Sequence, residues 1–365
     1  MRILAFGTYD AKLHPRILTL IEGLRSSGDV VRELNAPLGM STADKVKVLK
    51  NPARLPRLAF RMLNKWATLA ARSIKFHGKA SPDAVIVGYM GHFDILLARL
   101  CFPGTRIILD HLISAAGTAQ DRGDNVRLKL KLLRLLDRVA IACADVVVVD
   151  TVEHREALTP AQQCKAIVLP VGAPQEWFDT QRVVGEAGTE PLSIVFYGLF
   201  TPLQGTLTIA RALRALHERR VPVSATLVGT GQDFEQAQEI LSGVPVNWID
   251  WVESEKLPQL VANHDVCLGI FGTTDKGLRV VPNKVYQGAA VGCAIVTSST
   301  EPQRRALGDA ALYAEAGDPE ALADVLERLA SDRDQVDWMR SRARQVAVEN
   351  FAPMSVVEPL RKLLA

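Results

Sequence analysis

The segment LSIVFYGLFTPLQGTLTIARAL (residues 192–213) contains the structural unit from which the fold of this chain can be predicted. It begins with an apolar, β-branched run that is typical of a buried strand, and it turns at Gly198. After Gly205 the apolar residues recur three and four positions apart, which predicts a helix. A buried strand that leads through a glycine turn into a helix is the building unit of parallel sheets with helices on both faces.

The same unit recurs along the whole chain. Strands are expected at 2–7, 29–34, 83–88, 105–110, 145–150 and 165–170, and again at 192–198, 223–229, 246–251, 265–272 and 293–299. The polar segment 179–190 separates the two series and is interpreted as a linker. Helices are expected at 319–350 and 354–364. The sequence therefore predicts an α/β protein with two doubly wound, Rossmann-like domains, at 1–178 and 190–345.

Composition sets the class of protein. The chain has 365 residues, enough for about two domains at roughly 150 residues each, and 48% apolar with 23% charged residues is ordinary globular composition. The five cysteines form no C-x-x-C pair, which disfavours a zinc ribbon and suggests reduced thiols in the cytoplasm. Met1–Phe6 resembles a strand rather than a signal sequence, and charges interrupt every apolar run before it could span a membrane.

Charge is unevenly distributed. Residues 1–178 hold 25 Lys and Arg against 16 Asp and Glu, whereas residues 179–365 hold 18 against 24. Lys45–Lys79 contains ten basic residues and no acid. Apolar residues near helical spacing in this stretch are Leu58, Met62, Trp66, Leu69 and Ile74.

Two interpretations of Lys45–Lys79 stay open. It can form a basic helix on an anionic membrane surface or beside an anionic or lipid-linked acceptor. It can also be an ordinary helix that covers a domain and turns its basic residues to solvent. Nucleic-acid binding is disfavoured, because only Phe60, Trp66 and Phe76 interleave with the charges.

Three cations surround the expected start of a helix in the second half. Lys276 and Arg279 precede Pro282, a residue suited to a first helical turn, and Lys284 follows it. Positive charge at a helix N-terminus is unfavourable unless an anion compensates it. We therefore expect a bound phosphate or diphosphate here, with a solvated basic loop as the alternative.

Polar residues also follow strands of the first half. Gly7 would let the backbone approach an anion, and Asp110 and His111 stand where a strand ends, suited to proton or hydroxyl contacts. The alternatives are a capping role for Asp110 and an inert structural role for His111. His92 is a weaker candidate for a substrate contact. The G-x-G after the strand at 223–229 lacks a third glycine, which disfavours nicotinamide binding.

Several motifs together resemble a known family. FYGLFTPLQGTLTIARAL, LVGTGQD and PNKVYQGAAVG resemble the second domain of family-four retaining glycosyltransferases (glycosyl transferases group 1), and VGYMGHFDILLA resembles the first domain of one branch. The resemblance implies the GT-B fold, two facing Rossmann-like domains with the last helix, 346–365, packing back on the first. It also implies transfer of a sugar from a nucleotide-diphosphate sugar to an acceptor hydroxyl, with retention and without a metal or other cofactor.

The chain departs from this family at four positions. Leu199 and Gln204 replace the family's Arg and Lys, and Arg279 and Gln287 replace its two glutamates. We therefore expect the donor diphosphate to be bound by a rearranged set, with Lys276 and Arg279 supplying the lost charge. The residues expected at the diphosphate are Gly7, Gly198, Thr201, Lys276, Arg279 and Lys284; those at the nucleoside are Trp251, Val252, Asn283 and Gln287; Asp110 and His111 would orient the sugar.

Other functions remain possible for the same fold. The lost glutamates would suit a non-catalytic nucleotide-sugar-binding protein. A nucleotide-sugar epimerase or a phosphorylase is a further alternative, although no pyridoxal-type lysine is apparent for a phosphorylase. Trp251 is alternatively a core residue rather than a base contact.

Overall fold

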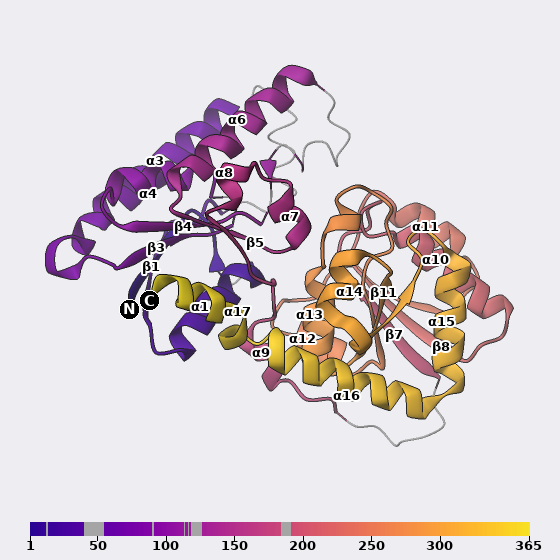
Figure 1. The fold of residues 1–365 in the computed structure, drawn as a ribbon. Coiled ribbons are helices and arrows are strands. Elements are labelled where there is room, and N and C mark those ends of the chain that lie inside the picture. The colour runs from indigo at the N-terminus through magenta and orange to yellow at the C-terminus, as the bar shows by residue number, and fades with distance from the viewer. Residues whose placement is uncertain are drawn as a thin grey trace. The chain divides into compact units, whose positions relative to one another are not determined.

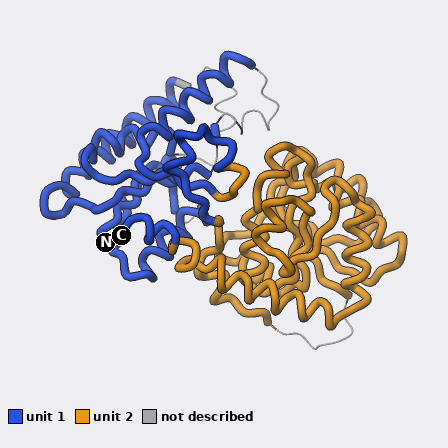
Figure 2. Tube along the Cα trace, in the orientation of Figure 1, with its two compact units in different colours: residues 1–149, 155–169, 359–365 blue, residues 150–154, 170–358 orange. Residues whose placement is uncertain are grey.

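The structure of the protein is a computed structural model that describes residues 1–11, 14–39, 55–89, 91–112, 114–115, 117, 126–183 and 191–365. The chain divides into two compact units (Figure 2). Unit 1 contains residues 1–149, 155–169 and 359–365, and unit 2 contains residues 150–154 and 170–358. Each unit is built around its own six-stranded sheet.

The sheet of unit 1 has the order β2-β1-β3-β4-β5-β6, and its strand pairs are parallel. The strands are β1 (Arg2–Gly7), β2 (Val30–Asn35), β3 (Ala84–Val87), β4 (Arg106–Asp110), β5 (Val146–Val149) and β6 (Ala166–Val168). The main helices are α1 (Pro15–Ser26), α3 (Leu55–Ser73), α4 (Asp94–Cys101), α6 (Arg127–Cys143) and α8 (Pro160–Gln163) (Figure 1). Short 3-10 turns lie at Ile74–Phe76 and Gly78–Ala80.

One face of this sheet carries a helical layer made of α3, α4 and α6. Leu69 of α3, Ile95 of α4 and Ile141 of α6 share a buried cluster with Val85 and Val147 of the sheet. All residues of β3 and β5 are buried, as expected for strands covered on both faces. The continuous apolar runs of the sequence therefore form the core of unit 1.

The sheet of unit 2 has the order β12-β11-β10-β7-β8-β9, also parallel. Its strands are β7 (Leu192–Tyr197), β8 (Val223–Val228), β9 (Val246–Ile249), β10 (Val266–Leu268), β11 (Ala294–Ser298) and β12 (Ala311–Ala314). The strand order reverses between β7 and β10, and ligands of such sheets bind outside the carboxyl ends of the strands at this switch point.

The helices of unit 2 flank this sheet. They are α9 (Gln175–Asp179), α10 (Thr206–Glu218), α11 (Phe234–Ile240), α12 (Leu257–Ala262), α13 (Asn283–Ala290), α14 (Glu301–Leu307), α15 (Pro319–Ser331) and α16 (Arg333–Asn350), with 3-10 turns at Gly277–Arg279 and Gly308–Ala310. Helix α7 (Val152–Glu156) and helix α17 (Pro353–Leu364) each contain residues of both units.

The predicted fold class is confirmed: two parallel, helix-covered sheets form an α/β protein, and the eleven expected strands are present. Two details differ from the sequence analysis. Strand β12 was not expected, because its sequence, ALYA, contains no β-branched residue. The expected helix 319–350 is two helices, since Asp332 leaves the helical conformation and its side chain accepts a hydrogen bond from the Gln335 amide, capping α16.

Among the described helices, none has both the length and the apolar character that crossing a bilayer requires. Part of Lys45–Lys79 and residues 184–190 of the linker lie outside the described residues. Within α3, the apolar side singled out from the sequence faces the fold: Leu69 is fully buried, and the Trp66 indole donates to Asp94 of α4. Ile74, which follows α3, is 71% exposed.

Candidate functional site

A glycine turn occupies the switch point of unit 2. After β7 the chain turns at Gly198 (φ 140°) and enters α10 through Gly205 (φ 68°), both in conformations that favour glycine. A Cβ on Gly205 would lie 2.5 Å from the backbone nitrogen of Gly272, which follows β10. The turn is therefore in direct contact with the backbone that follows β10, and only glycine fits at position 205.

We expect Gly205→Ala to lower the free energy of unfolding by about 3 kcal/mol or more, because the added methyl meets rigid backbone and the residue must keep a left-handed conformation. Gly243→Ala is the matched control: Gly243 has φ 80° and no atom within 4 Å of its would-be Cβ, so only the conformational cost of about 1 kcal/mol remains. Urea unfolding measures both. Equal losses in the two variants would contradict the tight packing of the turn.

Lys284 is the buried cation of this turn. It lies in the first turn of α13, is 5% exposed, and its ammonium donates to Oε1 of Gln204. Its Nζ is 4.1 Å from the centre of the Phe196 ring and 3.2 Å from the position that a Cβ on Gly198 would take. The side chain of Lys284 thus reaches from α13 to the glycine turn that follows β7.

The environment of Lys284 disfavours the charged form of its side chain. Burial lowers the pKa of Lys284 to about 7. Within the described residues, no carboxylate forms an ion pair with it. A buried cation with a single amide acceptor and an aromatic face is costly, and an anion bound at the turn would offset that cost.

The other two cations lie on the loop between β10 and α13. Lys276 is half-buried and precedes the 3-10 turn, whereas Arg279 is exposed and its carbonyl accepts from the Thr151 hydroxyl. A Cβ on Gly277 would lie 3.5 Å from the carbonyl oxygen of Leu203. The loop that carries both cations therefore runs beside the glycine turn, which also contains half-buried Thr201.

The residues expected at the nucleoside differ in their exposure to solvent. Gln287 is buried, and its Oε1 accepts a hydrogen bond of 2.9 Å from the Tyr197 hydroxyl. Asn283 is exposed and Val252 is half-buried. Trp251 is 75% exposed, which excludes its interpretation as a core residue.

In unit 1, the carboxylate of Asp94 accepts hydrogen bonds from the turn after β1. The backbone amide and the hydroxyl of Thr8 both donate to Oδ2 of Asp94, at 2.7 and 2.8 Å. A Cβ on Gly7 (φ 155°) would lie 3.1 Å from the same oxygen. The amide that follows Gly7, expected to approach an anionic ligand, thus already bonds to a carboxylate.

The end of β4 carries a buried ion pair. Oδ1 of Asp110 is 3.1 Å from Nε of Arg16 on α1, and the two side chains are only 1% and 3% exposed. Removing either partner would leave a buried charge, so the pair fixes the end of β4 to α1. His111, the next residue, is also buried, and its amide donates to the carbonyl of Val148.

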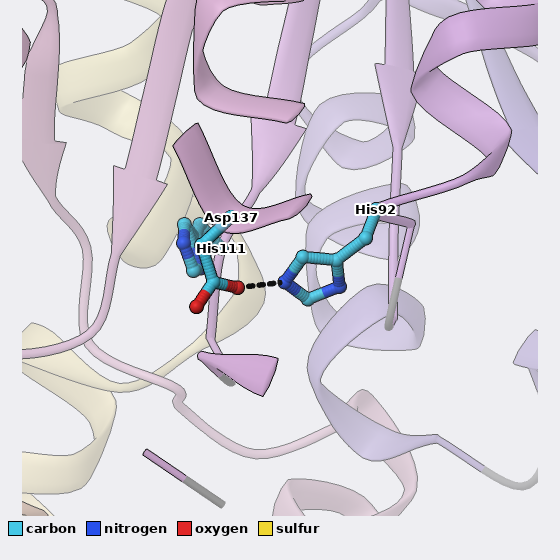
Figure 3. A group of neighbouring side chains, drawn as sticks. All are labelled: His92, His111 and Asp137. Carbon is cyan, nitrogen blue, oxygen red and sulfur yellow. Dashed lines mark ion pairs between the residues drawn. The ribbon is translucent and has the colours of Figure 1, made fainter. Parts of the chain in front are cut away.

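His111 belongs to a group of three buried side chains, shown in Figure 3. Nε2 of His92 is 2.9 Å from Oδ1 of Asp137 on α6, and the His92 and His111 rings are 5.3 Å apart and nearly perpendicular. Their ligand-type atoms lie within 4.8 Å of one another. Two imidazoles and a carboxylate are a set that zinc-like ions accept.

The carboxylate of that group is already engaged, however. Oδ2 of Asp137 accepts from the Ser114 hydroxyl at 2.8 Å, and Oδ1 accepts from the Ala115 amide at 2.9 Å. Asp137 thereby holds the segment after β4 in place. Neither Asp137 nor the contact between Lys284 and Gln204 was found from the sequence, because 45 residues separate His92 from Asp137 and 80 separate Gln204 from Lys284.

Residues 191–332 match the family described as Glycosyl transferases group 1. No curated protein matches the chain. Similar solved structures include Anabaena HepE in complex with UDP-glucose (13% identity, TM-score 0.67, covering 100% of this chain and 99% of that one) and sucrose-phosphate synthase from Thermosynechococcus elongatus (13%, 0.70, 100% and 98%).

A third is a trehalose-6-phosphate protein from E. coli bound with UDP-2-fluoro glucose (14% identity, TM-score 0.68, covering 100% of this chain and 99% of that one). At such identities the likeness shows the fold alone, and that fold is GT-B.

Proposed function

Residues 191–332 match the glycosyl transferases group 1 family, and from this premise we propose that the protein is a retaining glycosyltransferase. It moves a sugar from a nucleotide-diphosphate sugar to an acceptor hydroxyl, in the cytoplasm and with no metal ion or other cofactor on the diphosphate. The observation that carries the proposal is the buried ammonium of Lys284 at the glycine turn of the switch point.

The charge that develops during transfer explains this placement. As the bond from the sugar to the diphosphate breaks, the leaving phosphate gains negative charge, and preorganised cations and amides stabilise it. Lys284, held by Gln204, supplies a cation at the turn where the family's Lys and Arg are missing. Lys276 and Arg279 on the adjacent loop, with Gly198 and Thr201, complete the proposed diphosphate site.

Retention of configuration requires the acceptor hydroxyl to attack the sugar from the same face from which the leaving group departs. The acceptor oxygen forms the new bond to the sugar carbon, the old bond to the phosphate oxygen breaks, and the acceptor proton passes to that phosphate oxygen. No protein nucleophile is needed. We assign the orientation of the sugar to His111, with Asp110 fixing the end of β4 through Arg16, and contacts with the nucleoside to Trp251, Val252, Asn283 and Gln287.

A panel of nucleotide sugars tests the proposal. UDP-sugars come first, because HepE and the E. coli protein hold UDP-glucose and UDP-2-fluoro glucose. A true donor at 100 times its Kd stabilises the protein by about 2.7 kcal/mol, which a thermal melt detects. Release of the nucleoside diphosphate with an acceptor shows transfer. Binding without turnover would instead favour a non-catalytic nucleotide-sugar-binding protein, the alternative suggested by Arg279 and Gln287 in place of the family's glutamates. Conversion of the sugar without transfer would favour an epimerase.

We predict that Arg279→Ala raises the donor Kd by about 10-fold or more, and Lys276→Ala by a similar factor, since each loses a charge-assisted hydrogen bond of about 1.5–3 kcal/mol. Titration calorimetry with the donor measures both. Lys256→Ala is the control, because Lys256 is exposed and pairs with Glu253 on the surface. Unchanged affinity in both variants would remove this loop from the donor site.

We also propose an anionic or lipid-linked acceptor, with peripheral membrane contact through Lys45–Lys79. The support is the excess of basic residues in the first 178, which binding of the donor by unit 2 does not require. Competition by anionic lipids or phosphorylated glycans in the transfer assay tests the acceptor class. Equal rates with neutral soluble acceptors would contradict it.

A further inference from the structure

Helix α6 is apolar on two opposite faces. One face packs into unit 1, where Leu130, Ala140 and Ile141 are buried. The other face carries exposed apolar residues at positions i, i+4, i+7 and i+11, which lie on the same side of a helix. They are Leu128 (69% exposed), Leu132 (59%), Leu135 (55%) and Val139 (38%).

Single exposed leucines are ordinary, but a continuous stripe of four along three turns is not. A helix that only covers a sheet needs one apolar face, and α6 already has that face turned inward. The outward stripe adds nothing to the described core of unit 1. It is therefore a surface available for a partner.

The charges beside the stripe indicate the chemistry of that partner. Exposed basic residues of α6 are Arg127, Lys129, Lys131, Arg134 and Arg138. The only acid of the helix, Asp137, is on the inner face, where it pairs with His92. A second copy of the same face would bring like charges together, whereas an anionic surface would complement the basic residues.

We propose that α6 lies on the surface of an anionic phospholipid membrane. The stripe enters the boundary between headgroups and acyl chains, while the Lys and Arg residues meet the lipid phosphates, as in other interfacial amphipathic helices. No described helix spans a bilayer, so the contact is peripheral.

The neighbouring helices of the same layer have compatible surfaces. Leu100 of α4 is 78% exposed, and Phe60 and Leu63 of α3 are 70% and 58% exposed. Helix α3 carries four basic residues and no acid within 55–73. Since α3, α4 and α6 contribute to one buried cluster, they cover the same face of the unit 1 sheet, which Figure 1 lets the reader follow.

The α6 stripe itself lies outside Lys45–Lys79, where Trp66 and Leu69 face the fold and Phe60 and Leu63 are exposed on α3. It is also independent of the proposed transfer reaction. The experiment below contains no nucleotide sugar, so its failure would leave the donor site untouched, and failure of the donor site would leave this surface untouched.

Vesicle sedimentation with the full chain tests the proposal. Vesicles of equal parts phosphatidylcholine and phosphatidylglycerol should pellet the protein at low salt, and rising salt should release much of it by screening. Pure phosphatidylcholine vesicles should pellet at least 10-fold less. Leu128→Ser combined with Leu132→Ser and Leu135→Ser should lower the partition coefficient on anionic vesicles at least 10-fold, as should Lys131→Glu combined with Arg134→Glu and Arg138→Glu.

Trp338→Ser combined with Val348→Ser is the matched control, because both are exposed apolar residues of α16 in unit 2. This control should sediment like the unmodified protein, and all variants should keep its circular dichroism and melting temperature. Equal sedimentation of the α6 variants and the unmodified protein would overturn the proposal, as would equal sedimentation on neutral vesicles. Self-association that the serine variant abolishes, seen by ultracentrifugation without lipid, would assign the stripe to a second copy instead.

Discussion

Replacing Lys284 with methionine is expected to raise the donor Kd by about 10- to 100-fold, the loss of one charge-assisted hydrogen bond of about 1.5–3 kcal/mol at a desolvated site. Methionine keeps most of the volume and removes only the ammonium. Calorimetry with the nucleotide sugar that stabilises the unmodified protein measures the change. Lys256→Met is the control, since the Lys256 side chain is 75% exposed. This variant should bind the donor with an unchanged Kd.

The pH dependence of donor binding gives a sharper signature. Lys284 has a pKa of about 7 without ligand, and a bound phosphate would raise it. Donor affinity should then be greatest below pH 7 and fall by up to about tenfold per pH unit above it. Burial raises the pKa of Tyr197 and of Cys267 well above their ordinary values, so neither titrates in this range. A pH-independent Kd in the unmodified protein would refute the role of Lys284.

Stability should change in the opposite direction. The pKa of Lys284 falls from 10.5 to about 7 on folding, so between these values the unfolded chain binds more protons. The free energy of unfolding of the protein should therefore rise as pH increases from 7 to 10, by up to about 1.4 kcal/mol per pH unit from this group. Lys284→Met removes that slope and is expected to be more stable at pH 7. A residue that costs stability and improves binding is typical of a functional site.

Removing the carboxylate of Asp265 is expected to produce the largest loss of stability, about 3–5 kcal/mol for Asp265→Ala. Asp265 is 2% exposed and accepts from the amide and hydroxyl of Ser193. Its partners Arg182 and Arg333 lie at 2.7 and 3.2 Å. Alanine would leave these guanidinium groups near buried polar surface with no counter-charge.

Urea unfolding measures this loss, and Asp309→Ala is the control. Asp309 is 61% exposed and pairs with Arg342 on the surface, where a salt bridge contributes about 0–1 kcal/mol. Burial alone would raise the pKa of Asp265, but the Ser193 amide and the arginines outweigh it and hold the pKa well below its ordinary 3.8. Its contribution is thus complete above pH 4 and declines in more acidic solution. Similar losses in the free energy of unfolding for both variants would contradict a special stabilising role for the buried Asp265 carboxylate.

The fold class and most of the strands could be predicted from the amino-acid sequence. Short apolar runs such as 192–197, repeated between helical segments, favour a parallel sheet covered on both faces, and Gly198 and Gly205 marked the turn after this strand. Local patterns suffice for these features because a buried strand needs consecutive apolar residues and a left-handed turn favours glycine, so both are recorded in neighbouring positions.

Contacts between residues far apart in the sequence could be identified only in the folded structure. The side chain of Lys284 crosses to Gln204 because the strand order reverses between β7 and β10, a fact that no local pattern records. Asp137 reaches His92 because His92 lies just before α4, and α4 packs against α6. The leucines of α6 are visible in the sequence on two sides of the helix, but packing against the sheet selects the buried side, and so determines which stripe remains exposed.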